Sequence, residues 1–245
     1  MLRPLIFAST ILLLSGCASV YNPATGKHEL VFIDTGSEVA LGKSLDRKIR
    51  QESKVVTAVR ENQRVKDIGR KISAVCDRSD LQYQFYVLEN KELNAFSVPG
   101  GFVYVNTGLL KKANDSELAG VIAHEIAHVV ARHSVKHLQA ALGFNILMSV
   151  AFNQSDAVDL YRAANVIYNL VSLGYSREDE RQADKLAVSY VFKAGYDPQG
   201  MLSFFAKIKE EEKENGVGNI PVFLRSHPAV EERIANIKKE IASLK

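Results

Sequence analysis

The segment His124-Glu125-Ile126-Ala127-His128 places two imidazoles four residues apart among apolar residues that recur at helical spacing. Residues four apart share one face of a helix, so both rings can reach a single metal ion. From its position after the first imidazole, the Glu125 carboxylate can reach a water molecule at the metal and act as a general base. The alternative is a surface helix whose polar side chains face water, but residues 118–131 are too apolar for an exposed helix.

The residues around this motif predict a helix over about 116–137. Asn114-Asp115-Ser116 offers helix N-cap candidates, and Glu117 adds negative charge to the first turn. Similar signals along the chain predict a fold that is mainly α with a small β-sheet (α+β). The other expected elements are a helix from the capping-box-like Thr35-Gly36-Ser37-Glu38 to about Val55, a helix over 58–76, strands over 81–88 and 102–105, a helix over 157–173 that continues to about 194, a helix from Pro198 to about Lys213, and a helix from Pro228 to Leu244.

Two imidazoles do not complete a catalytic zinc site, which usually has three protein ligands and one open position. The best region for a third ligand is the charged segment Ser176–Asp184. Glu180 and Asp184 lie four residues apart, so one can bind metal while the other accepts the remaining N–H of a ligand histidine. The same residues also suit a solvated charged segment with ion pairs along one helix.

Together these residues resemble a known family. His124–His128 followed by Ser176-Arg177-x-x-Glu180-x-x-Ala183-Asp184 is similar to the HtpX-like and prenyl-protein-peptidase-like zinc metallopeptidases, peptidase family M48. The resemblance extends, in the order expected of the family, to Asn22-Pro23-x-Thr25-Gly26, Asn94–Gly101, Gly108-Leu109-Leu110, Ser226-His227-Pro228 and Arg233-Ile234.

The resemblance implies a zincin-like (gluzincin) metallopeptidase domain, expected over residues 36–245, that binds one zinc ion. It implies that Glu180 is the third zinc ligand beside His124 and His128. It also implies that Asp184 does not bind the metal itself but contacts one of its ligands. It further implies hydrolysis of misfolded or unfolded cell-envelope proteins. The Asn22–Gly26 segment is similar to the first residues of the family's periplasmic lipoprotein members.

The N-terminus resembles a bacterial lipoprotein signal peptide over residues 1–16. A short positive region containing Arg3 precedes the apolar run Leu5–Leu14, which is too short to span a membrane. Leu14-Ser15-Gly16-Cys17 then resembles a lipobox, so we expect lipidation, including palmitate, at Cys17. Two or more acyl chains anchor a protein stably. The alternative is an ordinary secretory signal with an incidental cysteine.

The residue after the cysteine is Ala18 and not aspartate. By resemblance to enterobacterial sorting rules, this favours the outer membrane, with the catalytic domain facing the periplasm. Residues 17–35 are then expected to form a lipid-anchored tether.

Composition excludes one class of partner and limits covalent cross-links. The formal charge of +3 falls to +2 once Arg3 is removed, and no basic stripe with interleaved aromatic residues is present, so nucleic-acid binding is not expected. With Cys17 acylated, Cys76 has no partner within the chain, and we expect no internal disulfide. Cys76 follows Ile72 and Val75 at helical spacing, which predicts a buried core thiol; an intermolecular disulfide is the alternative.

Two segments allow a functional or a structural interpretation. By the family fold, Phe102–Asn106 would be the edge strand beside the active site, where an extended peptide can bind through main-chain hydrogen bonds. A purely structural strand is the alternative. Leu138–Phe152 has no charged side chain and suits either a core helix hairpin or a membrane-dipping lid. The expected substrate-binding residues are Gly101, Val103, Tyr104 and Val105.

The remaining histidines differ in their expected roles. His133 lies about 140° around the helix from His128, so we expect a structural role. His137 is expected to be solvated near the helix end. His227 allows three roles: a donor to the oxyanion, a fourth zinc ligand that displaces the catalytic water in the resting enzyme, or a helix N-cap.

The sequence therefore predicts a zinc-dependent metalloendopeptidase in which Glu125 deprotonates the attacking water and the proton passes to the leaving amine. The expected partners are unfolded envelope polypeptides, the membrane through the lipid anchor, and components of the outer-membrane assembly machinery. The competing hypothesis is an outer-membrane protein assembly factor or chaperone whose metal site is structural or idle.

Overall fold

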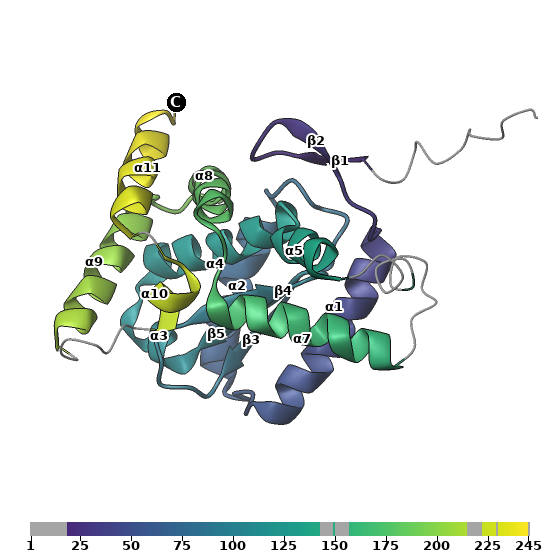
Figure 1. The fold of residues 1–245 in the computed structure, drawn as a ribbon. Helices are drawn as coiled ribbons and strands as arrows, with labels where there is room; N and C mark the ends of the chain where they lie inside the picture. Colours follow the sequence, from purple (N-terminus) through teal and green to yellow (C-terminus); the bar gives the residue numbers. More distant parts are fainter. Residues whose placement is uncertain (1–18, 143–148, 150–156, 215–221, 229, 245) are drawn as a thin grey trace, which may run out of the picture.

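Helices form most of the molecule, around a small three-stranded sheet, and a two-stranded hairpin lies beside them (Figure 1). The structure is a computed structural model that describes residues 19–142, 149, 157–214, 222–228 and 230–244. The expected mainly α fold with a small β-sheet is confirmed. The elements are β1 (Ser19–Asn22), β2 (Lys27–Leu30), α1 (Thr35–Glu52), α2 (Val59–Ser73), β3 (Gln84–Leu88), β4 (Ala95–Val98), β5 (Phe102–Asn106), α3 (Thr107–Lys112), α4 (Asp115–Val130), α5 (His133–Ala141), α7 (Ala157–Leu173), α8 (Arg177–Lys193), α9 (Gln199–Glu214), α10 (Val222–Ser226) and α11 (Val230–Ala242).

Helix α4, which carries the two motif histidines, is the central helix of the fold. Asn114 caps its N-terminus and forms a capping box with Glu117, as the sequence signals predicted. The helix packs against α2, α8, α9 and the strand β4, and its residues from Glu117 to Val130 are all buried. This burial excludes the surface-helix alternative.

The single helix expected over 116–137 is wrong, because the chain breaks it after Val130. Arg132 adopts a left-handed backbone conformation with φ of 54°, and α5 begins at His133. A non-glycine residue at positive φ cannot continue a right-handed helix. The buried Arg132 guanidinium is held in place by an ion pair with Glu38 and by hydrogen bonds to the Ile33 carbonyl and the Thr35 hydroxyl.

The helix expected to run from 157 to about 194 is also interrupted. Gly174 has φ of 98°, a conformation that separates α7 from α8. Ser176 then caps α8 and forms a capping box with Asp179. The interruption redirects the chain, so Glu180 lies on a helix that packs against α4.

The sheet has the strand order β3-β5-β4, which corrects the expected edge strand. β5 pairs with β3 on one side and with β4 on the other, so its main-chain groups are not available to a peptide. Helices α2 and α4 cover one face of the sheet, and α1 and α7 cover the other. The interpretation of Gly101, Val103, Tyr104 and Val105 as substrate-binding residues of an edge strand is therefore wrong, and the edge strand beside α4 is β4.

The segment expected to be a tether contains the β1–β2 hairpin. Ala24 in its turn is buried, and its carbonyl oxygen accepts a hydrogen bond from Lys185 of α8. α1 then begins after Asp34, whose carboxylate caps the helix by accepting from the Ser37 N–H, so the cap lies one residue earlier than expected. The division between tether and domain at residue 35 stays a prediction.

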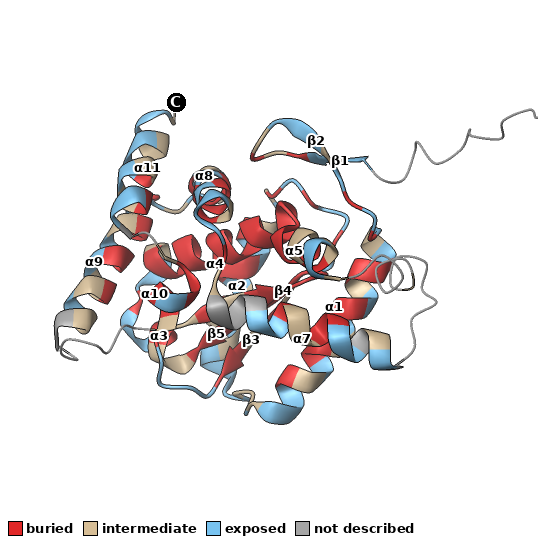
Figure 2. Ribbon diagram, in the orientation of Figure 1, coloured by how far each residue is buried: buried red, intermediate tan, exposed pale blue. Residues whose placement is uncertain are grey.

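Buried residues run through the middle of the molecule and the exposed residues lie around it (Figure 2). Cys76 is a buried thiol within the larger apolar core, as expected. Leu138 is buried on α5, but most of the segment 138–152, including Phe152, lies outside the described residues, so the choice between lid and core hairpin stays open. Among the described residues, no helix combines the length and the apolar character needed to cross a membrane.

Candidate metal centre

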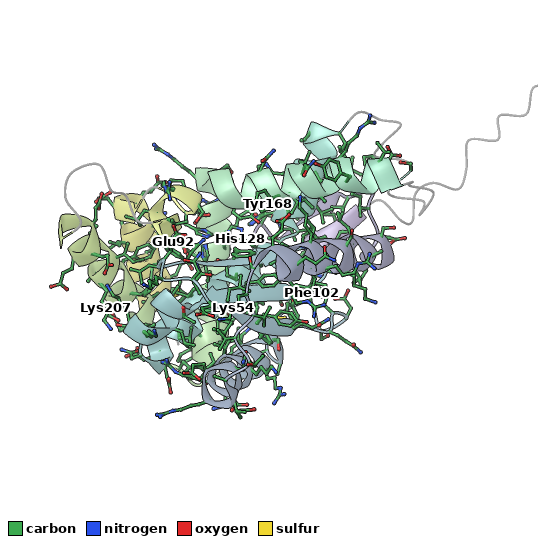
Figure 3. All side chains as sticks on the ribbon, turned by 90° about the horizontal axis from the view of Figure 1, so that it is seen from below. Lys54, Glu92, Phe102, His128, Tyr168 and Lys207 are labelled. Carbon is green, nitrogen blue, oxygen red and sulfur yellow. The ribbon has the colours of Figure 1, made fainter. Side chains whose placement is uncertain are left out.

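Four side chains from three parts of the chain converge at one buried point. His124 and His128 come from α4, Glu180 from α8, and His227 from the turn after α10. One potential ligand atom of each residue lies within 4.8 Å of all the others, and the four residues are buried. His128 lies in the interior of the molecule in Figure 3. The first three are the metal ligands that the sequence analysis expected.

The spacing of these atoms fits a small cation. Two ligands about 2.0–2.1 Å from a tetrahedral zinc ion lie about 3.3 Å apart. The Nε2 atoms of His124 and His128 are 3.0 Å apart, and Nδ1 of His227 lies 3.3 Å from Nε2 of His124 and 3.0 Å from Oε1 of Glu180. Three imidazoles and a carboxylate form a donor set that suits zinc. The residues present therefore fit the metal that the sequence predicts.

Each α4 histidine is supported on the side that faces away from the cluster. Nδ1 of His124 lies 2.9 Å from the Asp184 carboxylate. Nδ1 of His128 lies 2.8 Å from Nδ1 of His133, and Nε2 of His133 lies 3.3 Å from the Gln182 side-chain oxygen. Burial lowers the pKa of His133 to about 4, so its neutral ring accepts from the His128 N–H and donates to Gln182. These contacts leave both Nε2 lone pairs directed at the cluster.

Arg233 of α11 connects Glu180 and Asp184, the two buried carboxylates of α8. Its guanidinium forms two hydrogen bonds with Asp184, of 2.8 and 2.7 Å, and an ion pair of 2.7 Å with Glu180. Burial by itself raises the pKa of Glu180, but Arg233, with His227 and His124, lowers that pKa well below its usual range. Glu180 is therefore ionised, as a metal ligand must be.

Glu125 faces the same cluster from the adjacent position of α4. The Ser97 hydroxyl of β4 lies 3.0 Å from one carboxylate oxygen of Glu125, and the other oxygen lies 3.4 Å from Nε2 of His227. That second oxygen has no hydrogen-bond partner among the described residues. Burial raises the pKa of Glu125 against the opposing effects of His227 and His124. A buried carboxylate with a raised pKa and a free oxygen suits a general base.

Several contacts around the cluster were not expected from sequence. The Tyr175 ring stacks on His128 with a centroid distance of 3.9 Å, and its hydroxyl bonds Ser134 at 2.7 Å. Tyr175 follows Gly174 in the interruption between α7 and α8, so the sequence offered no spacing signal for it. His137 was expected to be solvated, but it is only partly exposed and hydrogen-bonds Asp179 at 2.8 Å.

The remaining predicted site residues fall into three groups. The ring nitrogens of His227 are directed at Glu180, His124 and Glu125, which leaves none for a helix cap. Cys17 lies outside the described residues. The four residues expected to bind substrate lie in or beside the central strand of the sheet, outside the cluster: Gly101, Val103, Tyr104 and Val105.

A model of peptidase family M48 matches residues 59–241. The chain belongs to this family. The matched span includes the four clustered side chains and Glu125, so the resemblance seen in the motifs is confirmed. The expected enzyme class, a zinc metallopeptidase, is the class of this family.

Three relatives of this M48 chain carry the names of proteases. It is 27% identical over 215 residues to a putative beta-barrel assembly-enhancing protease of Vibrio cholerae, covering 82% of this chain and 43% of that protein. It is 28% identical over 166 residues to the metalloprotease LoiP of Escherichia coli, covering 66% of this chain and 64% of LoiP. It is 29% identical over 180 residues to a mitochondrial metalloendopeptidase of Schizosaccharomyces pombe, covering 71% of this chain and 51% of that protein. The chain thus spans less than half the length of the first of these relatives.

Proposed function

We propose that this protein is a zinc-dependent endopeptidase of the cell envelope. The observation that carries the proposal is the convergence of His124, His128 and Glu180 beside the carboxylate of Glu125. Three ligands and an adjacent general base are the parts that metal-assisted peptide hydrolysis requires. A purely structural zinc site needs no general base within reach.

His124, His128 and Glu180 would hold the zinc ion, with Asp184, His133 and Arg233 fixing their orientation. Zinc supplies Lewis-acid polarisation of a carbonyl and lowers the pKa of water. Glu125 accepts the proton of the attacking water at its free oxygen and then delivers it to the leaving amine. The Ser97 hydroxyl holds the other oxygen of Glu125 and orients the carboxylate.

His227 acts in this proposal as the fourth donor of a resting site. Its Nδ1 lies as close to Glu180 and His124 as the other donors lie to one another. With zinc bound, the His227 ring would serve as a fourth ligand, in place of the water that a catalytic site admits. His227, Glu125 and the three expected ligands are all buried, which supports a closed resting site from which His227 has to leave before substrate enters.

We further propose that substrate pairs with the edge of β4 that carries no partner strand in the described part of the chain. Ser97 of this strand contacts Glu125, which places the strand beside the catalytic carboxylate. A groove of about 440 Å³ lies against β4 on the side opposite Ser97 and is lined by Phe96, Val98, Leu45, Tyr168 and Arg225, among others. An extended segment can add to a strand edge through main-chain hydrogen bonds. Such binding selects unfolded polypeptides, because a compact domain offers no free extended segment.

The names of two relatives support an envelope role. One is named a putative beta-barrel assembly-enhancing protease, and another is the metalloprotease LoiP. Together with the lipobox at Cys17, they support an outer-membrane lipoprotein whose domain faces the periplasm and cleaves misfolded or stalled envelope proteins. The word assembly in the first of these names also supports a second candidate function, an outer-membrane protein assembly factor that binds its clients without cleaving them.

Casein cleavage measured with and without a metal chelator separates these two functions. We expect cleavage that the chelator abolishes and added zinc restores. Glu180→Ala should remove zinc and cleavage together, because it deletes a ligand. Glu178→Ala is the matched control, since Glu178 lies two residues away on the exposed side of α8 and should keep both. Binding of unfolded protein without any chelator-sensitive cleavage would favour the assembly factor.

A further inference from the structure

The β1–β2 hairpin presents one polar and one partly apolar face. The register pairs Ser19 with Leu30 and Tyr21 with His28, so these four side chains share one face. The other face carries Val20, Asn22, Lys27 and Glu29. Asn22 is buried and donates to Gln182 of α8 at 3.2 Å, so this second face packs against the domain.

The same alternation continues beyond the hairpin. Leu30 is 67% exposed and Phe32 is 48% exposed. The alternate residues Val31 and Ile33 are buried, at 2% and 0%. Tyr21 is 54% exposed on the neighbouring strand. We refer to Ser19, Tyr21, His28, Leu30 and Phe32 as the outer face. Three large apolar or aromatic side chains thus point away from the domain within one short segment.

The hairpin is fixed to the domain and cannot turn this face inward. Glu29 bonds Lys136 of α5 at 2.8 Å, and the Ala24 carbonyl accepts from Lys185 of α8 at 3.0 Å. Gln139 of α5 accepts from the main-chain N–H of Phe32 at 2.6 Å. An isolated two-stranded hairpin is at best marginally stable, so these contacts hold its orientation.

The position of the lipobox cysteine suggests what covers the outer face. Cys17 lies two residues before Ser19, the first residue of β1. Two residues of fully extended chain reach at most about 7 Å. An acyl chain on Cys17 would therefore hold β1 at the bilayer surface with almost no intervening linker.

We propose that the outer face of the hairpin rests in the interfacial region of the bilayer, as a second contact beside the lipid anchor. The inference rests on the anchor at Cys17 that is part of the proposed function. Tyrosine and phenylalanine suit this region because their rings are apolar and a tyrosine hydroxyl can stay hydrated. The domain then has a fixed orientation on the membrane, and residues 19–33 of the expected lipid-anchored tether (17–35) contribute to that orientation.

This orientation directs the substrate groove away from the membrane. α1 begins at Thr35, shortly after the outer face, and its 18 residues span about 27 Å. Its far end, at Ile49 and Glu52, lines the groove beside β4. The hairpin and this end of α1 lie at opposite ends of the view in Figure 1. Periplasmic polypeptides could thus reach the groove while the hairpin stays on the lipid.

The absence of tryptophan from the chain allows a direct test with single-tryptophan reporters. Leu30→Trp and Tyr21→Trp place the reporter on the outer face. Phe192→Trp is the control, because Phe192 of α8 is also a large exposed side chain, at 47%. Each full-length lipidated protein is reconstituted into vesicles of phosphatidylethanolamine and phosphatidylglycerol that contain brominated lipid. We expect several-fold stronger quenching, and a blue-shifted emission, for the two outer-face reporters than for the control.

Three other results would overturn the proposal, and each would lead to a different conclusion about the outer face or the anchor. Equal quenching at all three positions, on vesicles that carry the protein in a flotation assay, would show an anchored domain whose hairpin is off the membrane. A blue shift without vesicles that grows with protein concentration would assign the outer face to a second copy of the chain. Failure to float would refute the lipid anchor and with it the membrane contact. Casein cleavage in the same samples reports the peptidase activity independently.

Discussion

Each metal-facing residue depends on a partner that orients it. The helical spacing in the sequence was sufficient to predict His124, His128 and the adjacent Glu125. Two residues that are four apart on one helix have fixed relative positions on one face. Arg233 could not be predicted to act at the site, since it lies 49 residues after Asp184 and reaches it only through the packing of α11 on α8. Tyr175 was missed for the same reason.

Replacement of His227 distinguishes its two remaining roles. If His227 is a fourth donor that closes the resting site, His227→Ala should retain zinc through the three other ligands and raise basal casein cleavage. If it donates to the oxyanion, cleavage should fall by about 100-fold or more with zinc retained. The distances of 3.0 Å to Glu180 and 3.3 Å to His124 favour the first result. Zinc content and cleavage have to be measured on the same preparation, and unchanged activity would contradict both roles.

At the scale of secondary-structure elements, two interruptions shape the site. The break at Arg132 allows His133 to turn back onto His128, and the break at Gly174 places Tyr175 on the same ring. Apolar periodicity predicted the helices on both sides of each break but not the breaks themselves. A positive φ at arginine depends on its buried contact with Glu38, which lies 94 residues away in the chain.

Gly174 offers a test of the second interruption. A Cβ atom there would lie 2.8 Å from the Ser226 carbonyl oxygen, next to His227, and its φ of 98° disfavours any other residue. Gly174→Ala should therefore lower the free energy of unfolding by more than the roughly 1–2 kcal/mol expected from positive φ alone. Gly195→Ala is the control, because Gly195 has φ of 79° but no atom within 4 Å of its added Cβ. Equal losses in denaturant unfolding would show that contact with Ser226 is unimportant.

At the scale of the whole molecule, the order of the strands could not be read from the sequence. β5 was expected to be an edge strand, and the four-residue β4 was not predicted at all. β5 is buried throughout because helices cover both faces of the sheet and strands flank both edges of β5. This arrangement depends on long-range pairing, whereas local patterning reports only that a segment is apolar and extended.

Cys76 tests the packing of the larger core. Burial raises the pKa of this thiol, and it lies 3.5 Å from the Tyr83 hydroxyl between α2 and β3. The thiolate is the reactive form, so Cys76 should react very slowly with a disulfide reagent in the native protein at neutral pH. One equivalent should react at once in guanidinium chloride if Cys17 is acylated. Rapid labelling of the native protein would contradict a buried position for Cys76.

The metal-binding cluster and Glu125 together would form the peptidase active site that we propose. The most direct measurement is zinc content and casein cleavage for Glu125→Gln, determined on one preparation beside the unmodified protein. The amide keeps the shape of the side chain but is a very poor base. We expect one zinc ion per chain in both proteins and a rate at least ~100-fold lower in the variant. Full zinc occupancy with undiminished cleavage would rule out Glu125 as the general base.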